Sequence, residues 1–119
     1  MSSRTTPTLT YTALLGQILQ YHRQRVGLSQ AGVAAALGIL QPAYSRIEKG
    51  DTSITVAQLR IVARTVGMNA AQLVQEAEIW AENLRRQGVP VTDEKEVPKA
   101  ALVVGLAILA AALLASAGS

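Results

Sequence analysis

The chain contains no cysteine and no phenylalanine, and it has only one tryptophan and one histidine. Without cysteine there is no disulfide framework, no thiolate nucleophile and no cysteine-bound zinc, which fits a reducing cytoplasm. His22 alone cannot build a histidine-rich metal site. Glycine-rich phosphate loops, paired catalytic carboxylates and a nucleophile elbow are also missing. The sequence therefore predicts no catalytic residue, no metal and no cofactor, and it argues against an enzyme.

Aromatic residues make up only 3% of the 119 residues, so a core has to be built from Leu, Val, Ile and Ala. Small and aliphatic cores suit closely packed helices, and the abundant Ala, Leu, Gln, Arg and Glu all favour helix. A chain of this length has room for one compact domain with an appendage. We therefore expect an all-α fold.

Charge is missing from everything that follows Lys99. Residues 100–117 are all apolar or small, and as a helix they would be roughly 27 Å long, close to the thickness of a bilayer's hydrocarbon core. Lys95 and Lys99 lie on the domain side, where the positive-inside rule places them if the domain is cytoplasmic. This is the layout of a C-terminal membrane anchor.

A soluble alternative for the same segment stays open. Ala107, Ala111 and Ala115 repeat at four-residue spacing, and such a stripe lets helices approach one another closely in lipid. The same residues could instead pack in an oligomer, as a bundle of alanine-faced helices.

The net charge of +3 conceals a division along the chain. Residues 1–68 carry seven basic and two acidic side chains, a balance of +5, whereas residues 69–99 carry four basic and six acidic ones, a balance of −2. The first part of the chain is therefore the one suited to a polyanion.

Caps and apolar spacing divide residues 9–87 into five predicted helices. Apolar residues recur at three- and four-residue steps over 9–26, which is the spacing of one helix face. Capping boxes at 55–58 and 69–72 predict where the fourth and fifth helices begin. The expected organisation is a flexible arm at 1–8, a helical domain with an extended fifth helix at 9–87, a linker at 88–99 and a hydrophobic, transmembrane helix at 100–117.

Two short helices predicted at 30–37 and 41–49, joined by a tight turn, have the size of a helix-turn-helix. The segments "LSQAGVAAALGI" and "YSRIEKGD" share a spaced pattern: Ser-Gln, seven residues, Gly, six residues and Ser-Arg-Ile-Glu-Lys-Gly. With "LRIVARTVGM", this pattern resembles the lambda-repressor/Cro-like (Xre-type) DNA-binding family over roughly residues 12–75. The resemblance implies a five-helix bundle whose third helix lies in the major groove of DNA.

The resemblance also assigns roles to individual residues. It implies that Gln30 donates to a phosphate at the start of the second helix, and that Lys49 and Thr52 contact backbone phosphates. It implies that Glu48 is a structural acid that pairs with Arg23. The residues implied to face base edges are Gln41, Pro42, Ala43 and Arg46.

Two positions depart from the family pattern. Leu40 stands where the third helix normally opens with Ser or Thr, and Pro42 stands where a second polar reader is common. Base readout is therefore expected to depend on few side chains, chiefly Gln41 and Arg46. Low intrinsic specificity would follow, which makes dimerisation or tethering more important.

These observations predict a sequence-specific, DNA-binding transcriptional regulator with a cytoplasmic domain, anchored in the inner membrane. The predicted partners are double-stranded DNA, membrane lipid through residues 100–117, and further copies of the chain in a homodimer or larger homo-oligomer. Two alternatives stay open. One is a membrane-attached helix-turn-helix scaffold that binds a protein filament or partner, and the other is an antitoxin or phage-type repressor whose tail drives oligomerisation.

Overall fold

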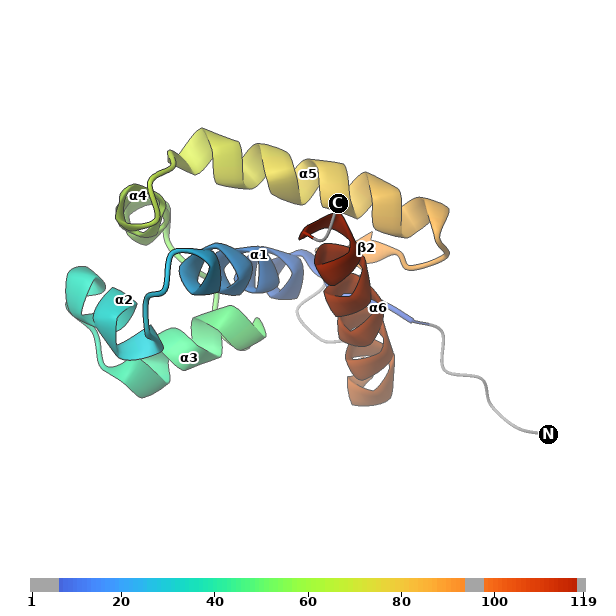
Figure 1. Ribbon diagram of the computed structural model, residues 1–119. Helices are drawn as coiled ribbons and strands as arrows, with labels where there is room; N and C mark the ends of the chain where they lie inside the picture. The colour runs from blue at the N-terminus through green and yellow to red at the C-terminus, as the bar shows by residue number, and fades with distance from the viewer. Residues whose placement is uncertain (1–6, 94–97, 118–119) are drawn as a thin grey trace.

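The computed structural model describes residues 7–93 and 98–117 of the chain (Figure 1). They form six helices and two strands of two residues each, so the predicted all-α fold is confirmed. The elements in chain order are β1 (Leu9–Thr10), α1 (Tyr11–Arg25), α2 (Gln30–Leu37), α3 (Gln41–Lys49), α4 (Val56–Thr65), α5 (Ala70–Arg86), β2 (Val91–Thr92) and α6 (Lys99–Ala117).

The helices begin where polar side chains satisfy the free amides of the first turn. Ser29 caps α2 by accepting a hydrogen bond from the Gly32 amide. At α4 and α5 the reciprocal capping boxes expected from the sequence are both formed, by Thr55 with Gln58 and by Asn69 with its partner three residues on. α3 begins without a side-chain cap, because Leu40 has no acceptor to offer.

Helix α1 is the centre of the domain. It packs against α3 on one side and α5 on another, while α2 and α4 complete the bundle. Its buried residues Leu14, Ile18 and Leu19 lie in one apolar core with Val33 and Leu73 of the surrounding helices. Figure 1 shows α5 running above α1, with α2 and α3 below it.

The ends of the domain differ from the sequence-based expectation. A helix was predicted to begin at Leu9, but Leu9 and Thr10 form strand β1, and Thr10 caps α1 by accepting from the Ala13 amide at 3.0 Å. Residues 88–99 were predicted to be a linker because they show no helical spacing, and within them Val91 and Thr92 form β2, which pairs with β1 in parallel. Helical spacing cannot reveal a contact between residues more than eighty positions apart.

Helix α6 begins one residue before the predicted start and leans against α1 and β1. In Figure 1 it stands at the end of the molecule away from α2. Ala101, Leu109 and Leu113 are buried against the domain, whereas Val103 and Leu114 are exposed. In the described part of the chain this is the one helix long and apolar enough to cross a membrane. Its apolar stretch is Lys99–Ser116, and 22% of that stretch is buried inside the protein.

Candidate nucleic-acid interface

The turn between α2 and α3 places the third helix across the domain surface. Gly38 ends α2 with a φ of 71°, a left-handed conformation that glycine adopts without a steric penalty. The Gly38 and Ile39 amides donate to the last carbonyls of α2, which closes the turn. α3 then runs from Gln41 to Lys49, as the sequence predicts.

A close backbone contact seats α3 on α1. Gly16 of α1 faces the carbonyl oxygens of Ile47 and Glu48, and a Cβ added at Gly16 would lie 2.4 Å from the Glu48 oxygen. A few residues on, Gly50 lies equally close to Ala13. Glycine at these two positions lets the helices approach more closely than any side chain would allow.

A buried ion pair fixes the same two helices. Arg23 of α1 donates through Nε and Nη2 to the Glu48 carboxylate of α3, at 2.7 Å and 3.0 Å. Its Nη1 donates to the Leu28 carbonyl, so the guanidinium also holds the loop before α2. Hydrogen bonding to Glu48 raises the pKa of Arg23 above its usual value, although burial acts the other way. The structure thus contains the Arg23–Glu48 pair that the family resemblance implies.

The polar network continues to the surface through two glutamines. Gln30 Nε2 donates to the Glu48 carboxylate at 2.9 Å, and Gln41 Nε2 donates to Gln30 Oε1 at 2.8 Å. Each amide nitrogen has a second proton, so both glutamines can still donate to a ligand. Gln41 is exposed, and its Oε1 is available as an acceptor beside that donor. This hydrogen bond between the two glutamines could not be predicted from the sequence, because it depends on the angle between α2 and α3.

The remaining predicted contact residues lie along the outer side of α3 and just beyond it. Pro42, Arg46, Lys49 and Thr52 are exposed, and Ala43 is half-buried. Tyr44 and Ile47 on the opposite side are buried in the core, as expected. Burial raises the pKa of Tyr44, whose hydroxyl makes no hydrogen bond within the described residues.

Leu40 belongs to this surface although it was not among the predicted contact residues. Its side chain is 79% exposed at the start of α3, directly before Gln41. The sequence could have indicated this role, because Leu40 replaces the usual polar cap of the third helix. An apolar group at that place could contact a thymine methyl.

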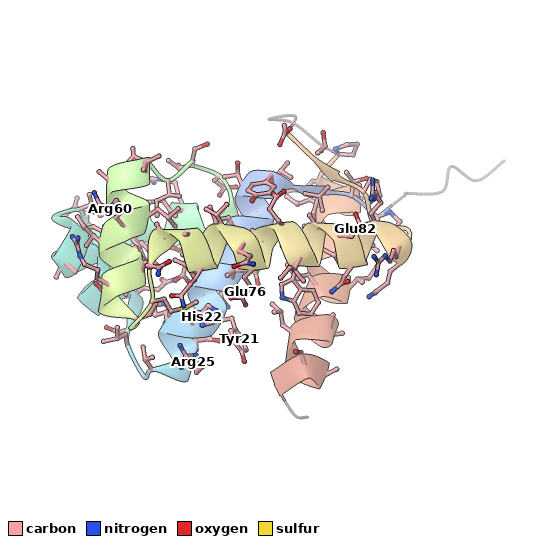
Figure 2. The ribbon with its side chains drawn as sticks, turned by 90° about the horizontal axis from the view of Figure 1, so that it is seen from above. Tyr21, His22, Arg25, Arg60, Glu76 and Glu82 are labelled. Carbon is pink, nitrogen blue, oxygen red and sulfur yellow. The ribbon has the colours of Figure 1, made fainter. Side chains whose placement is uncertain are left out.

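A second polar cluster lies between α1 and α5. Figure 2 shows His22 and Glu76 pointing toward one another, with Arg25 farther along α1. His22 Nε2 and a Glu76 carboxylate oxygen are 2.7 Å apart, and Arg25 Nε donates to His22 Nδ1 at 3.2 Å. Since Nδ1 accepts, Nε2 carries the proton donated to Glu76. His22 therefore joins two helices. No group of acidic or histidine side chains within the described residues is arranged to hold a metal ion.

Comparisons with known proteins agree with this geometry. Residues 19–73 match the family described as helix-turn-helix. Two crystal structures of the clp gene regulator ClgR from Corynebacterium glutamicum are similar to the chain, each with a TM-score of 0.55 and 23% identity. One match covers 59% of this chain and 91% of ClgR, the other 65% and 88%. Comparison with curated proteins gives no significant match.

Proposed function

Because residues 19–73 match the helix-turn-helix family, we propose that this protein is a DNA-binding transcriptional regulator that inserts α3 into the major groove. The observation that carries the proposal is the anchored glutamine pair beside the exposed edge of α3. Gln41 is held by Gln30, which is held by the buried Glu48. A side chain already fixed by its neighbours loses less rotamer freedom when it binds a base.

The chemistry of each exposed group fits one part of a DNA duplex. Gln41 presents an acceptor and a donor, the pair that adenine matches in the major groove, and Arg46 can contact guanine. Gln30 and Lys49 are suited to phosphates on either side, with Thr52 in the following loop. Pro42 and Ala43 supply small apolar surface, to which we add Leu40. With so few polar side chains to contact bases, low intrinsic specificity is expected.

The charges on this face support the same assignment. Glu48 is buried and already paired with Arg23, so it does not present a free carboxylate to phosphate. Asp51, two residues after Lys49, is the exposed acid next to this edge. Basic residues outnumber acidic ones by seven to two over residues 1–68.

Binding of the full chain to duplex DNA at increasing salt tests this function. Selection from a random duplex library would first provide a preferred sequence. Arg46→Ala should weaken binding to that sequence by about 1–3 kcal/mol, and Lys49→Ala should weaken binding to all duplexes and reduce the salt slope by about one. Arg85→Ala, an exposed arginine on α5, is the matched control and should change neither. If the affinity for DNA changes neither with salt concentration nor in Arg46→Ala, the protein-scaffold alternative is favoured instead.

We further propose that α6 anchors the protein to the inner membrane, with the helix-turn-helix domain in the cytoplasm. The support is the composition of α6: its apolar stretch has a mean hydropathy of 2.2, and its large side chains Val103 and Leu114 face outward. A helix of this length matches the hydrocarbon thickness of a bilayer. Anchoring side by side would also bring copies together, as the predicted homodimer or larger oligomer requires.

Cell fractionation tests the anchor. The test compares the full chain with a version ending at Lys99, each with a fluorescent protein fused to its N-terminus. After a carbonate wash of the membranes, the two should be found in different fractions. Retention of the full chain alone is the expected result. Recovery of both in the soluble fraction would contradict the anchor and favour α6 as an oligomer contact.

A further inference from the structure

Helix α6 makes a specific contact with the domain through one of its faces. The Thr8 amide donates to the Ala101 carbonyl at 3.1 Å, in the first turn of α6. One turn later Gly105 is buried against Thr8 and Leu9, where an added Cβ would lie 2.7 Å from the Thr8 oxygen. Leu109 and Leu113 continue this face at four-residue spacing and are buried. The contact therefore has a defined register on the domain.

The domain surface beneath α6 is polar where it meets the second half of the helix. Gln17, Gln20 and Gln24 of α1 line a cavity of about 190 Å³ whose other wall includes Ala110 and Leu113. Moving three amide side chains into hydrocarbon would cost several kcal/mol for each group left without a partner, so α1 cannot follow α6 into a bilayer. A membrane-spanning α6 must therefore leave this surface.

The two environments offer α6 very different coverage. The domain buries 22% of its apolar stretch and leaves Leu114 74% exposed to water. A bilayer would surround every side of the same helix. The pocket between Ala110 and α1, which is partly open to solvent, also means that the second half of α6 is less closely packed on the domain than the first.

We propose that the surface formed by β1 and α1 is a docking site for α6 that competes with lipid, so that the protein has a docked form in water and a released form in membranes. This inference rests on the proposed membrane anchoring. Release breaks the Thr8–Ala101 hydrogen bond and uncovers the Gln17–Gln24 side of α1. Lipid is thus a ligand that selects one of two arrangements of the chain.

A chemical crosslink tests the competition, since the chain has no cysteine of its own. The pair Gln20→Cys and Ala110→Cys lies on opposite walls of the cavity and should be joined by a short bismaleimide in water. Vesicles of phosphatidylcholine and phosphatidylglycerol, added before the reagent, should reduce crosslinking several-fold. Protein crosslinked first should fail to float with the vesicles, whereas each single-cysteine variant, treated in the same way, should float.

Two substitutions of matched size separate docking from hydrophobicity. Gly105→Leu collides with the Thr8 backbone and should reduce crosslinking in water while flotation is kept. Ala111→Leu adds a similar apolar group on the exposed face and should leave crosslinking unchanged. Amide exchange at Thr8 should accelerate in Gly105→Leu and on addition of vesicles, because its acceptor at Ala101 is withdrawn.

The outcomes distinguish this proposal from the anchor on which it rests. If the crosslinked chain floats as well as the free chain, the competition is wrong and the anchor stands. If no crosslink forms in water, the docked form does not exist, and competition is again overturned. If the free chain does not float at all, both the anchor and the competition fail.

Discussion

Helix α1 carries two other helices, α3 and α6, and holds them by different means. α3 is fixed by directional contacts: the Arg23–Glu48 ion pair and a backbone approach that only glycine permits at position 16. α6 is held by apolar side chains and by a backbone hydrogen bond in which the Thr8 amide donates to Ala101, and an open pocket separates part of it from α1. Hydrogen bonds and ion pairs hold a helix in one orientation. Apolar contacts only keep a helix face away from water, and another apolar surface can do the same. The proposed DNA-contacting role of α3 needs a fixed orientation, whereas the proposed transfer of α6 from water to lipid needs a contact that can be released.

The largest effect should come from breaking the directional contact. Glu48→Ala leaves the Arg23 guanidinium buried without its partner, and we expect it to lower the free energy of unfolding by about 3–5 kcal/mol. Denaturant titration measures the loss. Glu82→Ala, which removes an exposed pairing with Arg85 on α5, is the control and should change stability by less than about 1 kcal/mol. Equal losses in the two variants would contradict the importance of the buried pair.

The apolar contact should respond to side-chain size instead of charge. Leu109→Ala empties a fully buried position on the inner face of α6 and should weaken docking by about 2–3 kcal/mol. Limited proteolysis between β2 and α6 reports on docking and should become faster. Leu114→Ala on the exposed face is the matched control, and a similar acceleration there would show that α6 is not docked by this face.

The close approach of α1 and α3 gives a smaller effect with a clear control. Gly16→Ala forces the two backbones apart, and we expect a loss of about 1–3 kcal/mol together with shifted backbone resonances in α3. At Gly32 of α2 the nearest atom to an added Cβ is the Ser29 hydroxyl at 3.3 Å, so Gly32→Ala should be close to neutral or stabilising. Unchanged stability in Gly16→Ala would mean that α3 can be seated in another way.

The smallest expected effect concerns the first residue of α1. Burial, aided by the Glu78 carboxylate, raises the pKa of Tyr11 from 10.0 to about 12. The folded state therefore favours the protonated phenol, and this contribution to stability is complete below pH 10 and is lost as the pH rises toward 12. The free energy of unfolding should fall over that interval, and less steeply in Tyr11→Phe. Identical pH profiles would place Tyr11 in a more polar setting.

The sequence predicted the parts of this molecule that depend on neighbours along the chain. The capping boxes at Thr55 and Asn69 lie within one helical turn, and α3 has the predicted bounds because Gly50 ends it in a left-handed conformation, with a φ of 81°. The fold class and the match of residues 19–73 to the helix-turn-helix family could therefore be predicted. The roles of Gln30, Gln41 and Arg46 toward DNA stay predictions.

Other features depend on residues that are distant in sequence. Leu9 fitted the apolar spacing of α1, but pairing with Val91 and burial beneath α6 place it in a strand. Gly16 looks in the sequence like an ordinary weak helix position, and only the path of α3 explains it. The inner face of α6 was hidden because the whole segment is apolar, so that no spacing of polar residues marks one side.

The pairing of β1 with β2 also limits the distance between the helix-turn-helix domain and an α6 that is anchored in a membrane. Because Val91 and Thr92 pair with β1, six residues separate the paired strand from Lys99, and a chain of that length can span at most roughly 20 Å, against roughly 40 Å for the whole of residues 88–99. Effective concentration falls with about the three-halves power of tether length, so halving the tether raises it about threefold. Two helix-turn-helix domains anchored side by side would thus bind neighbouring half-sites, one DNA turn apart, more often than two domains on longer tethers would.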